Sequence, residues 1–155
     1  MKQYQLNVDP RILELLGPNL YTNIYYVLAE LIANAYDADA RNVYIVSGKD
    51  EITVEDDGHG MSYVAGDIAR YLNVAGVSRT SEDDSRTLSG SRRKMGRKGV
   101  GKLAALSVSE KVEILTVANG ERSGFILARR PENGNELKAI EDDKIVFERI
   151  AEHGT

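Results

Sequence analysis

Three polar side chains that could take part in chemistry lie at helical spacing in the stretch 28–40, which reads LAELIANAYDADA. On an α-helix Glu30, Asn34 and Asp37 point the same way, because residues three and four positions apart share a face. A carboxylate and a carboxamide one turn apart can share a metal ion and a water molecule. Chance polar residues on a solvated helix face would give the same pattern, so this stretch alone leaves both interpretations open.

A second polar group is the turn 56–61, which reads DDGHGM and follows a strand-like run. Asp and Gly are common where strands end in turns, which is its structural interpretation. In the functional interpretation Asp56 accepts a hydrogen bond from an amino group of a flat ligand, while Gly58 and Gly60 let the ligand ring approach the backbone. Met61 would then pack on the ring face. We interpret His59 as a spacer between the glycines rather than as a base.

The third group is the glycine-rich run 96–101, which reads GRKGVG and precedes a small-residue helix. Glycines allow backbone N–H groups to close on a phosphate, and a following helix presents further donors. A glycine-rich hinge is the competing interpretation. The run is not a Walker loop, because Lys102 is followed by Leu103 rather than by Ser or Thr. Its glycine spacing also differs from the Rossmann fingerprint.

Hydrophobic periodicity predicts the elements that would position these groups. Residues 20–38 are expected to form a long helix with one apolar stripe against a sheet. Two alternating runs, 41–47 and 51–55, are separated by a glycine-containing turn and predict a β-hairpin that leads into the acidic turn. The helix stripe expected to be buried consists of Ile24, Leu28, Leu31, Ile32 and Ala35.

Weaker patterns predict the remaining elements. Asn119-Gly120 is a typical hairpin turn between two alternating runs. Asp9-Pro10 can open a short helix, with Asp as its cap. The expected elements are an edge strand or arm in 1–10, helices 11–16, 62–74 and 102–107, strands 110–118, 122–129 and 144–149, and a loop at 131–136.

Length and composition indicate one globular domain spanning 1–155. Of its 155 residues 42% are hydrophobic and 28% are charged, which suits a soluble protein with a real core. The absence of cysteine excludes disulfides and thiolate metal sites, and two histidines argue against a histidine-based zinc site. We find no apolar run long enough for a bilayer and no leader-like start, so we expect no membrane partner and a cytoplasmic location.

Charge is unevenly distributed along the chain. The net charge of −4 argues against a domain that coats nucleic acid by charge alone. The segment 76–97 has no periodicity and is expected to be a lid or a disordered loop. Its cluster Arg92-Arg93-Lys94 could contact nucleic acid, and Arg97, Lys98 or Lys102 could close over phosphates. For the individual side chains we favour a third interpretation, a solvated loop.

The three motifs together, ELIANAYDADA, DDGHGM and GRKGVGKLAAL, resemble in order and spacing those of the GHKL superfamily of ATPases. Gyrase, the large heat-shock chaperones, histidine kinases and MutL belong to that superfamily. The resemblance covers about the whole chain. It implies the Bergerat fold, an α+β two-layer sandwich in which a helix layer covers one face of a mixed, mostly antiparallel sheet.

The resemblance also implies roles for individual residues. Glu30 matches the general base that activates water, and Asn34 matches the residue that holds Mg²⁺ against the phosphates of ATP. Asp56 matches the residue that binds the adenine amino group. The run 96–101 matches the loop that wraps the phosphates. The residues expected to bind ATP and Mg²⁺ are Asn34, Asp37, Ala38, Asp56, Gly58, Gly60, Met61, Gly96, Lys98, Gly99, Val100, Gly101, Lys102 and Thr155, with Asn34 as the metal ligand.

Within the superfamily the chain looks nearest to the chaperone, MutL and MORC-like branch, where the Glu acts on water. Gly154-Thr155 resembles the pair that opens a later strand, whose Thr reaches the adenine pocket. We therefore expect the chain to be the N-terminal fragment of a longer protein, with an incomplete sheet and low activity by itself. A downstream effector domain and homodimerisation are expected in the longer protein.

The resulting prediction is Mg²⁺-dependent ATP binding and hydrolysis, with ATP and ADP as ligands. A nucleotide-gated binding module that does not hydrolyse ATP is one alternative, and a histidine-kinase-type phosphotransferase is another. Whether the coupled partner is a client protein or a nucleic acid stays open.

Overall fold

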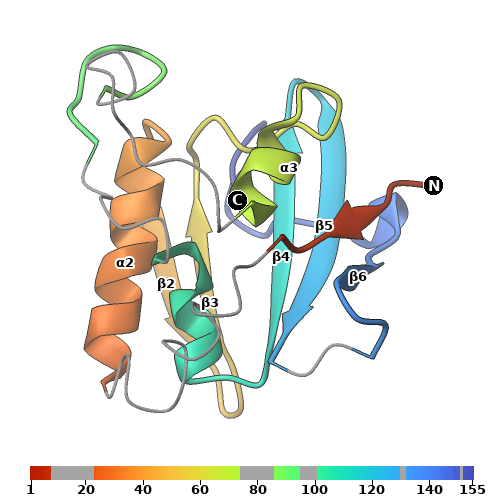
Figure 1. The fold of residues 1–155 in the computed structure, drawn as a ribbon. Helices are drawn as coiled ribbons and strands as arrows, with labels where there is room; N and C mark the ends of the chain where they lie inside the picture. Colours follow the sequence, from red (N-terminus) through yellow and green to blue (C-terminus); the bar gives the residue numbers. More distant parts are fainter. Residues whose placement is uncertain (8–22, 74–85, 95–100, 130–131, 151) are drawn as a thin grey trace.

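The computed structural model describes residues 1–7, 23–73, 86–94, 101–129, 132–150 and 152–155. Within these ranges three of the four helices lie on one side of a curled antiparallel sheet, so the predicted α+β class is confirmed (Figure 1). The expected helix 11–16, most of the expected lid 76–97 and the run 96–100 lie outside the described residues. None of the described helices is long and apolar enough to cross a bilayer.

The larger sheet has the strand order β1-β6-β5-β4, and every neighbouring pair is antiparallel. Strands β4 (Lys111–Ala118) and β5 (Glu121–Ala128) form its long hairpin. Asn119 and Gly120 have φ values of 53° and 76°, the backbone that a tight hairpin turn requires. Strand β6 (Glu136–Ala139) extends this hairpin, and β1 (Tyr4–Gln5) is the edge strand expected near the N-terminus.

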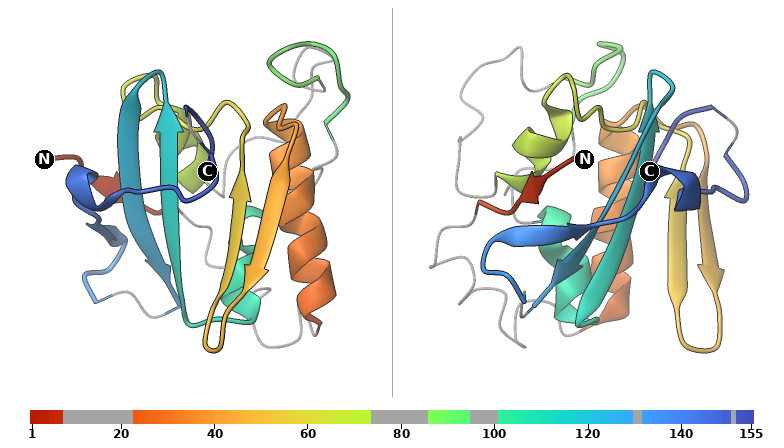
Figure 2. Two further views of the ribbon diagram at one scale, coloured as in Figure 1. Left: turned by 180° about the vertical axis from the view of Figure 1, so that it is seen from behind. Right: turned by 90° about the vertical axis from the view of Figure 1, so that its right-hand side faces the viewer.

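Strands β2 (Val43–Ser47) and β3 (Ile52–Asp56) form the second hairpin, as predicted. The end of the chain links it to the larger sheet, because residues 154–155 lie between β3 and β4 (Figure 2). Gly154 exchanges two backbone hydrogen bonds with Val117, at 2.9 and 3.0 Å. Thr155 exchanges two with Asp56, at 2.9 and 3.3 Å. The hydrogen-bonded network therefore runs from β2 across to β1.

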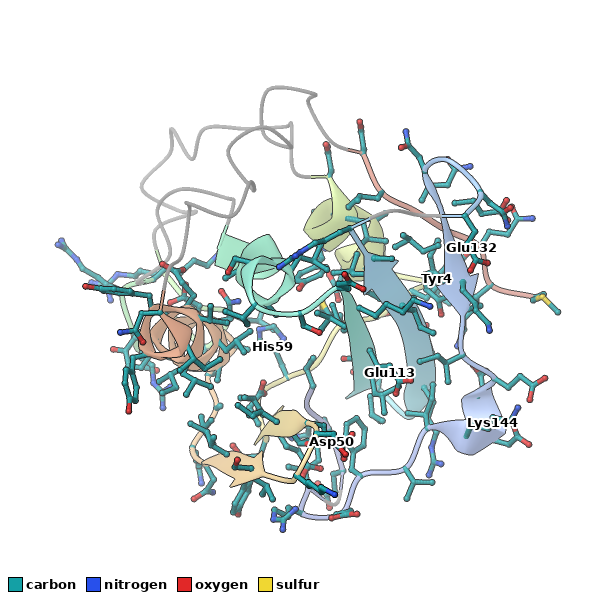
Figure 3. All side chains as sticks on the ribbon, turned by 90° about the horizontal axis from the view of Figure 1, so that it is seen from below. Tyr4, Asp50, His59, Glu113, Glu132 and Lys144 are labelled. Atoms are coloured by element: carbon teal, nitrogen blue, oxygen red, sulfur yellow. The ribbon has the colours of Figure 1, made fainter. Side chains whose placement is uncertain are left out.

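Helix α2 (Ile24–Asp37) is the long helix that the periodicity predicts. Asn23 caps it, because its side-chain oxygen accepts the Tyr25 N–H at 2.9 Å. The short helices α3 (Asp67–Leu72) and η2 (Gly101–Ser107) lie on the same side of the sheet as α2, and η2 packs against α2 (Figure 3). The short helix η3 (Asp142–Lys144) lies on the opposite side, near Glu113.

The main core lies between α3 and the inner face of the larger sheet. Phe125 is fully buried there, and its ring lies 5.0 Å from that of Tyr4, centre to centre. Burial of each large apolar side chain contributes about 1.5–3 kcal/mol. Around these rings the buried members are Leu6, Ile68, Leu72, Leu106, Ile114, Leu127 and Leu137.

Three predictions about elements and one about side-chain burial were wrong. The helix expected at 62–74 starts only at Asp67, because Gly66 has a φ of 82° and Ser62 holds a turn that precedes it. The strand expected at 144–149 is absent, and Ile145 is instead buried over Gly124 on the outer face of the sheet. Strand β6 was missed, since its start was read as loop. Ile32, expected in the buried stripe of α2, is 42% exposed.

Candidate functional site

The acidic turn rests on the C-terminal end of α2. The His59 N–H donates to the Ala38 carbonyl at 2.9 Å. A Cβ atom on Gly58 would lie 2.7 Å from the Ala38 Cβ and 2.8 Å from the Ala38 carbonyl oxygen, so only glycine fits this approach. His59, labelled in Figure 3, therefore belongs to a turn that packs directly on the end of the helix that carries Glu30 and Asn34.

Asp57 anchors the turn to the chain after α2. Its Oδ1 accepts the Arg41 and Asn42 N–H groups at 2.7 and 2.8 Å, and its Oδ2 accepts the Asn42 side-chain amide at 2.8 Å. Partial burial acts to raise its pKa, but these hydrogen bonds outweigh it and hold the pKa below its ordinary value. Asp57 therefore has a structural role.

The pKa of Asp56 is shifted in the opposite direction to that of Asp57. Burial raises the pKa of its carboxyl from 3.8 to about 6, against the lowering effect of the Gly58 N–H, which donates to Oδ1 at 2.8 Å. The neighbouring Asp57 charge raises the pKa further, while His59 and the Thr155 N–H lower it. A carboxylate offers about four acceptor positions. Asp56 thus keeps acceptor capacity in a partly desolvated place, as binding and catalytic carboxylates often do.

Close backbone contacts fix the surroundings of Asp56. Gly60 has a φ of +70°, and a Cβ there would lie 2.0 Å from the Val117 carbonyl oxygen. Gly154 has a φ of +148°, and a Cβ there would lie 1.9 Å from the Asp56 carbonyl oxygen. Met61 donates its N–H to the buried Thr116 hydroxyl at 2.8 Å and packs with its side chain against the main core. Strand β4, the acidic turn and residues 154–155 are therefore held in close backbone contact.

Asp56, Thr155 and Thr116 form a row across three neighbouring backbone segments. Thr155 pairs with Asp56 through backbone hydrogen bonds, and the pairing of Val117 with Gly154 sets Thr116 opposite Thr155. Residues directly opposite in antiparallel strands carry their side chains on the same face. The two hydroxyl oxygens lie 3.0 Å apart.

The two polar residues of α2 given chemical roles, Glu30 and Asn34, have no partner among the residues that the structure describes. Glu30 and Asn34 are half-buried, and neither side chain makes a hydrogen bond or ion pair within the described ranges. Within the described residues nothing competes with water or a ligand for their polar atoms. Asp37, one turn further along, is also half-buried.

The predicted phosphate loop, residues 96–101, lies mostly outside the described residues. Gly96, Lys98, Gly99 and Val100 lie outside the described residues, and the side chain of Lys102 is not described. Gly101 is the first residue of η2, which packs against α2. Gly101, the last residue of the run, therefore begins a helix that lies beside the one carrying Glu30 and Asn34.

The segment 86–94 docks on the C-terminal end of α2. Asp39 accepts hydrogen bonds from the N–H and hydroxyl of Ser89, both at 2.8 Å. Arg92 donates to the carbonyls of Tyr36 and Ala40, at 3.2 and 2.9 Å, and its guanidinium lies 4.7 Å from the centre of the Tyr36 ring. Our interpretation of Arg92 as a solvated side chain was therefore wrong, because it caps a helix end.

The donor set suits a magnesium ion rather than a protein-caged metal. Within the described residues no group of three or more His, Cys, Asp or Glu side chains could hold a metal ion. Mg²⁺ commonly takes only one or two protein oxygens and completes its shell with phosphates and water. The Asn34 carboxamide, which has no partner within the described ranges, fits that requirement.

Two cavities lie elsewhere. One of about 630 Å³ is lined by β1, Tyr63 and α3, and another of about 390 Å³ lies by η3 on the outer face of the sheet. Neither is lined by a polar residue of the predicted site, which is defined instead by its hydrogen bonds and close contacts.

Sequence reasoning missed two residues that build the site. Thr116 lies at an inward position of β4, between the buried Ile114 and Ala118, and a polar residue in that register was the available signal. Glu121 accepts the Tyr63 N–H at 2.7 Å and the Ser62 hydroxyl at 3.1 Å, which fixes the chain after the acidic turn. No local pattern marked Glu121.

Comparison with known proteins defines the class. Residues 21–155 match the model of the family described as histidine kinase-, DNA gyrase B- and HSP90-like ATPase. The chain belongs to this family, and the resemblance to GHKL ATPases is confirmed.

Individual relatives differ in what they are named for. The chain is 38% identical over 124 residues to a candidate type II restriction enzyme, HgiDII, of Herpetosiphon aurantiacus, covering 80% of this chain and 20% of that protein. It is 31% identical over 134 residues to the chaperone HtpG of Halalkalibacterium halodurans, covering 74% and 21%. It is 30% identical over 114 residues to HtpG of Bacteroides fragilis, covering 63% of this chain and 16% of that protein. The chain thus spans about a fifth of the length of these relatives.

Proposed function

We propose that this chain is an ATP-binding domain that takes up ATP with Mg²⁺ and hydrolyses it. The observation that carries the proposal is the junction of α2, the acidic turn and residues 154–155. Asp56 lies there beside Thr155, in a turn hydrogen-bonded to the end of the helix that bears Glu30 and Asn34, which have no partner in the described part of the chain. Membership of a family of ATPase domains supports the same reading.

Each residue is assigned one task. Asp56 accepts a hydrogen bond from the adenine amino group, and Gly58, Gly60 and Met61 form the backbone beside the ring. Asn34 holds Mg²⁺, which would neutralise charge on the phosphates, and the loop 96–101 supplies backbone donors to them. Asp37, Ala38, Lys98 and Lys102 are the supporting contacts that we propose.

Glu30 is the proposed general base. Its carboxylate accepts a proton from a water molecule while the water oxygen forms a bond to the terminal phosphorus. The bond from that phosphorus to the bridging oxygen breaks, and ADP and phosphate leave. Such a reaction needs positioning and charge neutralisation more than covalent help, so one carboxylate and one Mg²⁺ suffice.

The substitution Glu30→Gln tests the assignment. We expect ATP affinity, measured by calorimetry with Mg²⁺, to change less than about threefold, while phosphate release falls by at least about 100-fold, the range that general-base catalysis supplies. Glu110→Gln, an exposed residue far along the chain, serves as the control and should change neither value.

Three outcomes separate the alternatives. Unchanged phosphate release in Glu30→Gln would contradict the base assignment. ATP binding by the wild type without any phosphate release would favour a nucleotide-gated binding module. Transfer of labelled phosphate from ATP to a protein histidine would identify a kinase-type phosphotransferase.

The wider role is proposed from the relatives. In our proposal nucleotide turnover drives conformational change in a longer, dimerising protein. The relatives named as a chaperone and a restriction enzyme make a client protein or DNA the proposed partner. Arg92 argues against a dedicated nucleic-acid cluster at 92–94, because helix α2 already uses its charge.

A further inference from the structure

The buried hydroxyl of Thr116 has three neighbours whose hydrogen-bonding roles differ. Thr116 has no exposed surface. Its Oγ1 accepts the Met61 N–H at 2.8 Å, and it lies 3.0 Å from the Gly154 carbonyl oxygen and 3.0 Å from the Thr155 Oγ1. The amide can only donate and the carbonyl can only accept, whereas the Thr155 hydroxyl can do either.

Counting protons selects one arrangement. A hydroxyl has one proton and two lone pairs. If Thr116 donates to the Gly154 carbonyl, its lone pairs accept from Met61 and from Thr155, and all three hydrogen bonds form. If Thr116 donates to Thr155 instead, the Gly154 carbonyl loses its bond from Thr116 and the Thr155 proton has no partner in this group. The Gly154 carbonyl still accepts the Val117 N–H in the second arrangement, so no buried group is orphaned, but one hydrogen bond fewer forms, and this difference favours the first arrangement.

The first arrangement determines what Thr155 can offer a ligand. Its only proton points to Thr116, so the Thr155 oxygen presents lone pairs alone. Asp56, its direct partner across the backbone pair, presents a carboxylate on the same face. A base edge that meets both residues therefore finds only acceptors, which suits an exocyclic amino group and disfavours a carbonyl oxygen.

We propose that Thr116 is a positioning residue that selects 6-amino over 6-oxo purine nucleotides by fixing the direction of the Thr155 hydroxyl. This inference rests on the proposed ATP-binding function and names a residue that does not touch the ligand. Val at position 116 would keep the shape of the side chain but remove the acceptor, freeing the Thr155 proton to donate to a 6-oxo group.

The test compares ATP with inosine triphosphate, which carries a 6-oxo group, by calorimetry on the 155-residue chain. We expect Thr116→Val to reduce the ratio of ATP affinity to inosine triphosphate affinity by about tenfold. A tenfold change corresponds to about 1.4 kcal/mol, which is the size of one hydrogen bond. Thr116→Ser should restore the ratio. The exposed Thr53→Val carries the same substitution on β3 and should leave the ratio unchanged.

A double-mutant cycle tests whether Thr116 acts through Thr155. In the Thr155→Val background Thr116→Val should no longer change the ratio. An unchanged ratio in Thr116→Val, or an equal change with and without Thr155, would overturn the inference. If the wild type binds neither nucleotide, the proposed function itself fails. Thermal unfolding of each variant shows whether it folds. If Thr116→Val does not fold, Thr155→Val provides the test, and it must lower the ratio of ATP affinity to inosine triphosphate affinity.

Discussion

At the scale of single residues, Asp56 and Asp57 show how adjacent carboxylates acquire opposite roles. Asp57 is saturated with hydrogen bonds from the Arg41–Asn42 turn, and its pKa is lowered. Asp56 is more deeply buried, and its pKa is raised to about 6. A carboxylate that the fold holds at a cost in stability is better explained by ligand binding than by folding.

We predict that Asp56→Asn stabilises the protein while weakening ATP binding. The shift from 3.8 to about 6 corresponds to roughly 3 kcal/mol, so relief of part of this penalty should raise the unfolding free energy at pH 8 by about 1–2 kcal/mol. Urea unfolding and calorimetry measure the two effects. Asp57→Asn is the matched control and should lower stability without loss of ATP affinity. A destabilised Asp56→Asn would contradict this account.

The raised pKa of Asp56 also predicts how the free energy of unfolding depends on pH. Because the folded-state pKa of Asp56 is raised, its contribution to stability is fully present below pH 3.8 and is lost as the pH rises through about 6. The difference in unfolding free energy between wild type and Asp56→Asn should therefore change between pH 4 and pH 7 and stay constant above pH 7. Urea unfolding at several pH values tests this, and a difference independent of pH would contradict it.

Gly60 provides a test of the close backbone approach. Gly60→Ala should destabilise the protein by at least about 2 kcal/mol, because the new Cβ would meet the Val117 carbonyl oxygen at 2.0 Å and φ is +70°. Gly48→Ala is the control, since its Cβ would have an ordinary contact of 3.4 Å with the Glu51 carbonyl oxygen. Equal unfolding free energies for the two variants would show that the turn is not packed as described.

At the scale of elements, helix α2 connects the predicted site with the segment 86–94. Asn23 caps its first turn, and Arg92 and the His59 N–H satisfy carbonyls at and beyond its last turn. Positive charge near a helix C-terminus is favourable, because the carbonyl groups there carry partial negative charge. The segment 86–94 is thus held by the same helix end that supports the acidic turn.

We predict that Arg92→Ala releases the segment 86–94. Loss of two hydrogen bonds and of the contact with the Tyr36 ring should cost about 1–2 kcal/mol and speed hydrogen exchange at the Thr87 and Ser89 amides. Arg93→Ala, at the exposed neighbouring position, should stay within about 0.5 kcal/mol of the wild type. Similar exchange rates in both variants would show that Arg92 does not hold the segment.

At the scale of the whole molecule, the two sheets meet through residues 154–155. Strands β3 and β4 both pair with this short segment, which runs antiparallel to each (Figure 2). The junction also carries Asp56, Thr155 and Thr116. Its integrity therefore determines both the cohesion of the fold and the geometry of the candidate site.

We expect Gly154→Ala to separate the hairpin β2–β3 from the larger sheet. The new Cβ would lie 1.9 Å from the Asp56 carbonyl oxygen, which breaks the pairing there. Hydrogen exchange in β2 and β3 should become faster than in β4 and β5, and ATP affinity should fall by more than tenfold. Uniform exchange across all four strands would contradict the view that this segment joins the sheets.

Much of the local structure could be predicted from the sequence alone. The long helix, both hairpins and the three motifs follow from spacing and turn residues that act over a few positions. The sequence also implied the superfamily, which the family match confirms. Strand β6 and the absence of a strand at 144–149 could not be predicted, because Leu137 and Ile145 are placed by packing partners far along the chain.

The sequence by itself determined the family and predicted which residues would bind nucleotide, since Glu30, Asn34 and the glycines of the acidic turn lie in short, recognisable patterns. Only the tertiary structure decided that Thr116 and Thr155 stand in one row with Asp56, and that Arg92 caps a helix rather than facing solvent. These relations depend on sheet register and on contacts between segments distant in sequence. Local spacing carries no information about such pairings, because the backbone hydrogen bonds that create them form between whole elements.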